Sequence, residues 1–420
     1  MTAVTQRGVA PGTGAAAIVT SPGRLEGVDL LRGVVMVLMV LDHTREFFTD
    51  QHVDSTDLDT VSAALFLTRW VSHFCAPVFV LLAGTSSYLA LATGKFPTHR
   101  ALAGYLAVRG IVLMVLELTL VRLGWNFNLD YSFVLLQVIW AIGLAMICLS
   151  VFLAIGLGSR EIGLLGLTLI AGHNLLETAV LADLADTLKG WNWAWTILLR
   201  PGGIVLEPVR IQVAYPLLPW FGVMAVGFAF GEVLTLAPAT RRRITLGLGC
   251  TLVASFVLLR AFNTYGDPTP WKVHDAVHRT ILSFLNCQKY PPSLQYLFMT
   301  LGPGLVLLSV FLGSDGASRE VGRPVLDASR RILATFGRVP LFYYLIQWPV
   351  VHVLASATGV ISGQSVNWFV WSFDYPPGYG YNLSVVYAMW ALTIALIYFP
   401  CRWFAAYKRR HRDVAWLAFF

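Results

Sequence analysis

Apolar segments of about 20 residues recur along this chain, and that is the length an α-helix needs to cross a lipid bilayer. Of the 420 residues, 56% are hydrophobic and 13% are charged. An average soluble domain carries about a quarter charged residues. We therefore predict an all-α, polytopic membrane helix bundle with about ten transmembrane helices. The predicted spans are centred on residues 28–48, 63–92, 101–123, 132–155, 161–182, 211–234, 244–262, 294–313, 333–357 and 383–404.

Positive charge predicts the orientation of this bundle, because Lys and Arg concentrate in cytoplasmic loops. Most of these residues fall in loops that would share one side with both termini. We therefore predict that both termini are cytoplasmic and that the number of spans is even, with ten and eleven as the open alternatives. The expected location is the cell membrane, of the bacterial inner-membrane type. The predicted parts are a flexible cytoplasmic tail at 1–23, a transmembrane domain at 24–407 and a basic C-terminal tail at 408–420.

Charge and cysteine content narrow the function classes. The net charge is +7, but the basic residues are spread over loop ends, so no nucleic-acid partner is expected. The five cysteines offer neither a disulfide framework nor a Cys-x-x-Cys pair. Common phosphate-loop, nucleophile-elbow and zinc-helix motifs are absent from the sequence. His274 and His278 have i,i+4 spacing but few acidic neighbours, so we predict no metal site.

The first apolar segment, LLRGVVMVLMVLDHTREFF, carries Arg32 and His43 on one helical face. Eleven residues separate them, which places them about 20° apart around the helix axis and about 16 Å apart along it. An ionisable side chain inside a span costs about 3 kcal/mol unless it faces protein or water, so this face predicts a functional site. The structural alternative is a snorkelling Arg32 and a His43 that only bonds a neighbouring helix. The same face also carries Asp29, Met36, Met39 and Glu46.

Two further spans and one loop add candidate residues. His73 precedes Pro77 by four residues, which frees the carbonyl of His73 and predicts a kink; a functional and a structural histidine stay equally open. Arg109 in the third span is a candidate for a paired charge network. The loop sequence WNFNLDYSF offers polar groups that would bind a hydroxylated or amino ligand, with an ordinary turn as the alternative. Its candidates are Asn126, Asn128 and Asp130.

Three sequence features together resemble a known superfamily. They are RLEGVDLLRG, an Arg followed by ten residues and a His, and SHFCAPVFVLLAG. The combination resembles the transmembrane acyltransferase superfamily, in particular bacterial relatives of the catalytic domain of heparan-alpha-glucosaminide N-acetyltransferase, with kinship to the membrane acyltransferase-three family. The resemblance implies O- or N-acyl transfer, often of acetyl, from cytoplasmic acyl-CoA to a glycan or amino-sugar acceptor on the far side of the membrane. It implies catalysis by Arg32 and His43, with His52 as the alternative counterpart of His43.

These observations lead to specific role assignments. His43 is the predicted general base or transient acyl carrier, Glu46 would orient it from i+3, and Arg32 would bind CoA phosphate while Asp29 holds it. The predicted catalytic group is His43, Arg32, Glu46 and His73, the donor-binding group is Arg32, Asp29 and Arg109, and the acceptor-binding group is Asn126, Asn128 and Asp130.

The expected partners and the rival function complete these predictions. Acetyl-CoA is expected as a donor substrate and no cofactor is expected to stay bound. The other expected partners are the acceptor and the lipid bilayer, with a homodimer left open. The rival function is a proton-coupled secondary transporter of a polar solute, in which the same His, Arg and Glu groups would form a proton relay.

Overall fold

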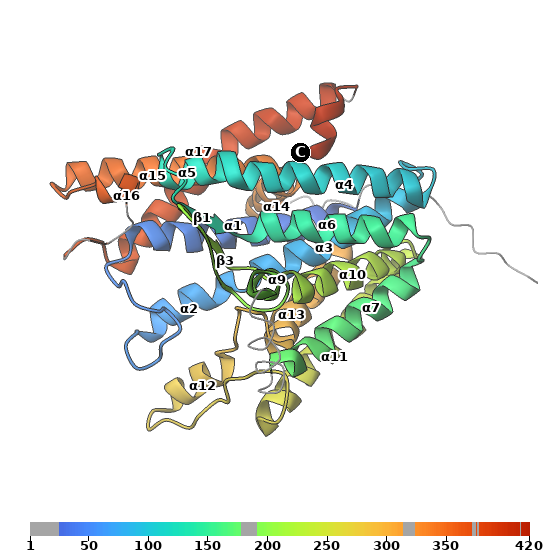
Figure 1. Ribbon diagram of the computed structural model, residues 1–420, viewed down its shortest axis with the longest axis horizontal. Helices are drawn as coiled ribbons and strands as arrows, with labels where there is room; N and C mark the ends of the chain where they lie inside the picture. The colour runs from blue at the N-terminus through green and yellow to red at the C-terminus, as the bar shows by residue number, and fades with distance from the viewer. Residues whose placement is uncertain (1–24, 178–190, 314–323, 372–374, 376–377, 412) are drawn as a thin grey trace, which may run out of the picture.

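The computed structural model describes residues 25–177, 191–313, 324–371, 375, 378–411 and 413–420. The predicted tail at 1–23 lies outside these residues. The described chain is mostly helical, at 73% helix. Six of its helical segments are long and apolar enough to cross a membrane (Figure 1). They are Ala63–Ala92, which comprises α2 (Ala63–Ser72) and α3 (Cys75–Ala92), α10 (Leu217–Leu234), α11 (Pro238–Phe262), α13 (Leu294–Gly313), α15 (Pro340–Ile361) and α17 (Leu383–Arg410).

Helix α1 (Glu26–Phe48) runs through the middle of the bundle (Figure 1). It contacts α2, α3, α13, α14 (Pro324–Arg338), α15 and α17. Its 23 residues are enough to span a bilayer, but its charged side chains set it apart from the six apolar segments. Most of its residues are buried by neighbouring helices. Asp29 and Arg45 are among these buried residues, and Arg32, Asp42 and His43 are partly buried.

The remaining described helices are not among the six membrane-length apolar segments. They are α4 (His99–Leu116), the π-helix η1 (Glu117–Val121), α5 (Arg122–Asn126), α6 (Val138–Ala154), α7 (Ser159–Gly172), the 3-10 helix η2 (His173–Glu177), α9 (Asn192–Leu198), α12 (Val277–Leu285), α16 (Trp368–Trp371) and the 3-10 helix η4 (Ala415–Phe419). The predicted span at 161–182 continues beyond the described residues. The predicted ninth span at 333–357 is divided, because α14 ends at Arg338 and Pro340 starts α15.

A small three-stranded sheet is the exception to the predicted all-α fold. Its strands are β1 (Phe133–Leu136), β2 (Gly202–Leu206) and β3 (Val209–Val213), in the order β1-β3-β2. Strand β1 pairs in parallel with β3, with Val134 opposite Ile211, and β2 pairs with β3 in antiparallel fashion. The β-branched residues of these segments favour extended backbone. The span predicted at 132–155 therefore begins as a strand and becomes helical only at Val138.

Close packing of α3 against α10 depends on two glycines. A Cβ added at Gly84 would overlap the carbonyl oxygen of Met224, and one added at Gly227 would overlap that of Leu81. Small residues allow helix backbones in membranes to approach this closely. The contact fixes the position of α3, whose Ser86 faces α1.

We expect Gly84→Ala to destabilise the fold by about 2 kcal/mol, because the added methyl group forces α3 and α10 apart. Thermal unfolding of the detergent-purified protein measures this as a lower midpoint. Gly104→Ala is the matched control, because a Cβ there meets nothing within 4 Å. Equal midpoints for the two variants would show that the α3–α10 contact does not limit stability.

Candidate functional site

A cavity of about 320 Å³ lies at the end of the bundle where α1 begins. Helices α1, α3, α4, α6, α14, α15 and α17 and the last residues of the chain line it. No acidic residue stands among its described lining residues, so its field attracts anions. We call it the basic cavity. Its cationic residues are Arg32, Lys95, Arg109, Arg338 and Lys408.

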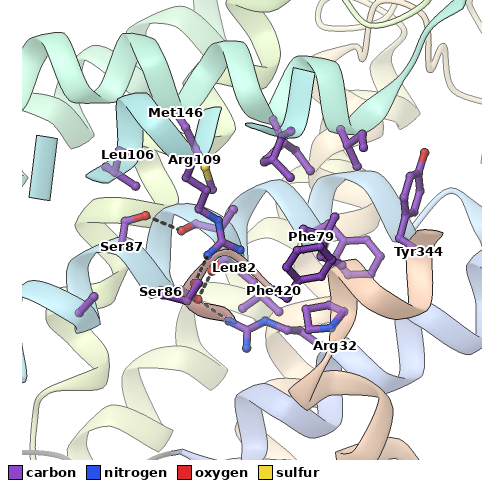
Figure 2. Close-up of a pocket in the computed structure, with 18 of the residues that line it drawn as sticks. Arg32, Phe79, Leu82, Ser86, Ser87, Leu106, Arg109, Met146, Tyr344 and Phe420 are labelled. Carbon is purple, nitrogen blue, oxygen red and sulfur yellow. Dashed lines mark hydrogen bonds between the residues drawn. The ribbon is translucent and has the colours of Figure 1, made fainter. Parts of the chain in front are cut away.

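Arg32 is fixed in the wall of the basic cavity. Its Nη1 donates to Asp29 Oδ1 over 3.3 Å, and its Nη2 donates to Ser86 Oγ. Arg32 and Arg109 reach toward the same part of the cavity from two different helices (Figure 2). The contact between Asp29 and Arg32 that the i,i+3 spacing predicts is present, and the guanidinium still faces the cavity.

The last residues of the chain close one side of the basic cavity. Lys408 of α17 and Ala418 and Phe420 near the end of the chain line the cavity, and Figure 2 shows Phe420 beside Arg32. Arg109 Nη1 donates to the Tyr105 hydroxyl over 2.8 Å, and that hydroxyl donates to Ala418 O, also over 2.8 Å. The predicted basic C-terminal tail therefore contributes directly to the cavity wall.

The basic cavity extends along α1 toward His43. Met36 and Met39 line it on the same helical face as Arg32, and His43 lies one turn beyond Met39. On α15, Tyr344 lines the cavity, and Trp348, one turn further on, stacks on His43 with ring centroids 3.8 Å apart. The predicted face of α1 thus lines the cavity from Arg32 to Met39, and His43 follows one turn further on, outside the lining residues.

Buried polar side chains gather beside His43. They include Gln347, which lies within hydrogen-bonding reach of the imidazole, and Tyr344 and Trp348, which lie within hydrogen-bonding reach of each other. These groups place hydrogen-bond donors and acceptors around His43.

A group of ion pairs flanks His43 on α1. Asp42 pairs with Arg69 of α2 and, over 3.1 Å, with Arg45 Nη2. Glu46 pairs with Arg45 over 3.0 Å, and no hydrogen bond among the described residues joins it to His43. The carboxylate next to His43 in this structure is Asp42, which acts on it electrostatically. Orientation of His43 by Glu46 stays a prediction.

His73 lies where the second span is interrupted. Helix α2 ends at Ser72 and α3 begins at Cys75, so the predicted kink is confirmed. Pro77 has no N–H to bond the His73 carbonyl, and the Tyr296 hydroxyl donates to that carbonyl instead over 2.8 Å. His73 is 1% exposed, and its electrostatic neighbours Asp42 and Arg69 are also neighbours of His43. Asp42 and Arg69 thus act electrostatically on both histidines.

A second pocket, of about 290 Å³, lies at the opposite end of α1. We call it the polar pocket, because all but one of its lining residues are polar. They are Arg45, Glu46, Thr49, Gln51, His52, Asp54, Ser55, Arg69 and Tyr375, with Val53 as the apolar member. His52 stacks on Tyr375 with ring centroids 3.8 Å apart. Arg45 and Arg69 also bond Asp42, so this pocket adjoins the ion pairs beside His43.

The predicted acceptor-binding residues lie in a loop held by Arg122. Its Nη1 donates to Asn128 O over 2.7 Å, and its Nη2 donates to Asn128 Oδ1 over 3.0 Å. Hydrogen bonds from the Ser132 backbone N–H and hydroxyl hold the pKa of Asp130 below its ordinary value. Neither Asn126, Asn128 nor Asp130 lines the basic cavity or the polar pocket. Their role in acceptor binding stays a prediction.

Several residues of the site carry only weak local signals in the sequence. Lys95 and Lys408 sit near helix ends, where basic residues are expected from membrane orientation alone. Asp42 lies on a different face of the helix from Arg32 and His43, although an acid beside a buried histidine is itself a signal. Arg69 stands out only as a charge inside an apolar segment.

The fold combines six membrane-length apolar helical segments with ionisable side chains on α1 between two cavities. These features define a multi-pass membrane protein with an internal polar site. The family model of the heparan-alpha-glucosaminide N-acetyltransferase catalytic domain matches residues 24–263, more than half of the chain, and the chain belongs to this family. The protein is therefore a membrane enzyme of the acetyltransferase type, and the match does not favour the transporter alternative. No curated protein sequence matches the chain. Kinship to the membrane acyltransferase-three family stays a prediction.

Proposed function

We propose that the protein moves an acetyl group from acyl-CoA, held in the basic cavity, to a glycan or amino-sugar acceptor in the polar pocket. One observation carries this proposal: the cationic cavity follows α1 along Met36 and Met39 to within one helical turn of the His43 imidazole, which stacks on Trp348. Arg32 and His43 are about 16 Å apart along α1. An extended thioester arm suits such a distance, with its phosphates at Arg32 and its acyl carbon at His43.

The charge of the basic cavity supports a phosphate-bearing donor. A guanidinium binds phosphate oxygens in a bidentate manner, whereas an ammonium acts as a compact point charge. Arg32 and Arg109 supply the first kind of group, and Lys95 and Lys408 supply the second. Their combined charge would offset the phosphates of CoA where the nucleotide enters.

His43 supplies the acid–base chemistry in this proposal. Neutral imidazole accepts the proton of the acceptor amine or hydroxyl while the acceptor N or O attacks the thioester carbonyl carbon. The new C–N or C–O bond forms a tetrahedral oxyanion, which collapses as the C–S bond breaks. The CoA thiolate leaves and takes the proton from the imidazolium, which returns His43 to its neutral form.

The polar pocket suits a hydroxylated or amino acceptor. Its lining combines carboxylates, such as Glu46 and Asp54, with hydroxyl and guanidinium groups, and it adds the stacked rings of His52 and Tyr375. Carboxylates accept hydrogen bonds from ammonium and hydroxyl groups, and aromatic rings offer flat apolar faces. Both properties match an amino sugar.

We expect Arg32→Lys to weaken CoA binding roughly tenfold, because a lysine cannot reproduce the bidentate phosphate contact although the charge is kept. Isothermal titration of the purified protein with CoA measures this change. Pantetheine, which has no phosphate, should bind both proteins equally. The control variant Arg243→Lys changes an arginine that lies outside the basic cavity.

Two results would count against the donor assignment. Equal weakening of CoA and pantetheine would exclude a phosphate contact at Arg32. A wild-type protein that binds no acetyl-CoA and acetylates no amino sugar would exclude the proposed function as a whole.

A further inference from the structure

Residues 413–420 follow helix α17 and lie against the basic cavity; we call them the cover segment. Apolar contacts hold this segment in place. Leu417 is 2% exposed and belongs to the main hydrophobic core. The Phe419 ring stacks on the ring of Tyr105, with centroids 5.7 Å apart, and Tyr105 itself lines the cavity from α4. The cover segment is thus attached to one wall of the cavity that it borders.

The backbone carbonyls of the cover segment accept hydrogen bonds from groups of the basic cavity. Lys408 Nζ donates to Phe420 O over 2.5 Å. Arg109 Nη1 donates to the Tyr105 hydroxyl over 2.8 Å, and that hydroxyl donates to Ala418 O over 2.8 Å. Arg109 Nη1 also donates to Ala418 O over 3.5 Å. Two of the cations that we assign to the donor phosphates are therefore in contact with the cover segment.

A phosphate competes with these carbonyls for the same hydrogen-bond donors. Ammonium and guanidinium groups have donors and no acceptors, so carbonyl oxygens and phosphate oxygens bind them in the same way. A phosphate also carries negative charge, which adds a Coulomb attraction to the cation that a neutral carbonyl lacks. We therefore expect a phosphate to displace the carbonyls of the cover segment from Lys408 and Arg109.

The cover segment is attached by few buried contacts. Among its described side chains, Leu417 is the only buried one. Asp413 and Ala418 are exposed, and Trp416 is 50% exposed. Segments with few buried apolar contacts open locally at a much lower free energy than the fold as a whole. The cover segment therefore opens without unfolding of the helix bundle.

We propose that the cover segment is an autoinhibitory lid on the basic cavity, which leaves Arg109 and Lys408 when the phosphates of acyl-CoA bind there. This inference rests on the proposed function and adds regulation of the donor site to it. The structure shows the closed form, in which Phe420 lies beside Arg32 in the cavity (Figure 2). Because CoA binds only the molecules whose lid is open, the lid lowers the apparent affinity for the donor.

Two substitutions release the lid without changing a residue that lines the basic cavity. Leu417→Asn places a polar amide in the apolar core, and Phe419→Ala removes the stacking on Tyr105. We expect each to lower the Kd of CoA about tenfold, which is the gain when the open form of the wild type is about 10% populated. Isothermal titration of the purified protein with CoA measures this change. Leu417→Met keeps an apolar side chain, so it is the matched control and should bind CoA as the wild type does.

Hydrogen–deuterium exchange of the wild-type protein measures the opening of the lid directly. CoA should speed the exchange of the backbone amides of residues 413–420, because the segment leaves its contacts when the phosphates bind. Pantetheine has no phosphate and should leave this exchange unchanged.

The outcomes separate the lid from the function on which it rests. Wild-type or weaker CoA binding in a folded release variant would overturn the lid and leave the transfer function intact. So would unchanged or slower exchange of residues 413–420 with CoA, because the segment would then be a fixed part of the donor site. Absence of CoA binding in the wild type and in both release variants would overturn the proposed donor itself. Should Leu417→Asn fail to fold, Phe419→Ala and the exchange of the wild type decide the question.

Discussion

Alanine at position 43 is expected to lower kcat for acetyl transfer by about 10³-fold, because no other group would take the acceptor proton at the acyl carbon. The affinity for CoA should stay close to that of wild type, since the phosphates bind near Arg32 at the start of α1. Transfer assays and isothermal titration of purified His43→Ala measure the two effects separately. The expected pattern is a nearly inactive protein that still binds its donor.

A panel of histidine variants provides the control. His52→Ala changes the polar pocket, His73→Ala changes the interruption between α2 and α3, and His278→Ala changes an exposed residue of α12. The largest loss of kcat should occur at His43, and His278→Ala should match wild type. Full activity in His43→Ala would refute its catalytic assignment. Parallel loss of binding and turnover would instead identify His43 as a donor-binding residue.

We expect acetyl transfer only when the donor is supplied to the cytoplasmic face and the acceptor lies on the opposite face of the membrane. The basic cavity and the polar pocket lie at opposite ends of α1, whose 23 residues measure about 34 Å. Labelled acetyl-CoA supplied to the cytoplasmic face of sealed vesicles should label an amino-sugar acceptor enclosed on the other face. The same donor supplied to the opposite face should give only background labelling. Basic residues predict which face is cytoplasmic.

Vesicles made permeable with detergent are the control for this experiment, because both substrates then reach both faces. Vesicles carrying His43→Ala report the background without catalysis. Labelling that occurs only when donor and acceptor share one face would contradict transmembrane transfer. It would leave a one-sided membrane acetyltransferase.

The sequence predicted the wall of the basic cavity that α1 provides. Helical periodicity alone places Arg32 and His43 on one face, and the structure shows Met36 and Met39 continuing that face along the cavity. The interruption at His73 followed from Pro77, since a missing N–H is a local property. The prediction of a helix from residue 132 was wrong for strand β1. Its extended backbone is stabilised by pairing with strand β3, which is distant in the sequence.

Only the tertiary structure decided which charged residues meet. Periodicity fixes angles within one helix but leaves open how helices rotate and pack against each other, and close contacts such as Gly84 against Met224 settle that. The pairing of Asp42 with Arg69 and the stacking of Trp348 on His43 join residues of different helices. Such contacts form only when the bundle brings the helices together, because the energy of a charge pair depends on the distance between the charges and on the exclusion of water. The sequence thus determined a membrane helix with an ionisable face, and the fold determined the site around it.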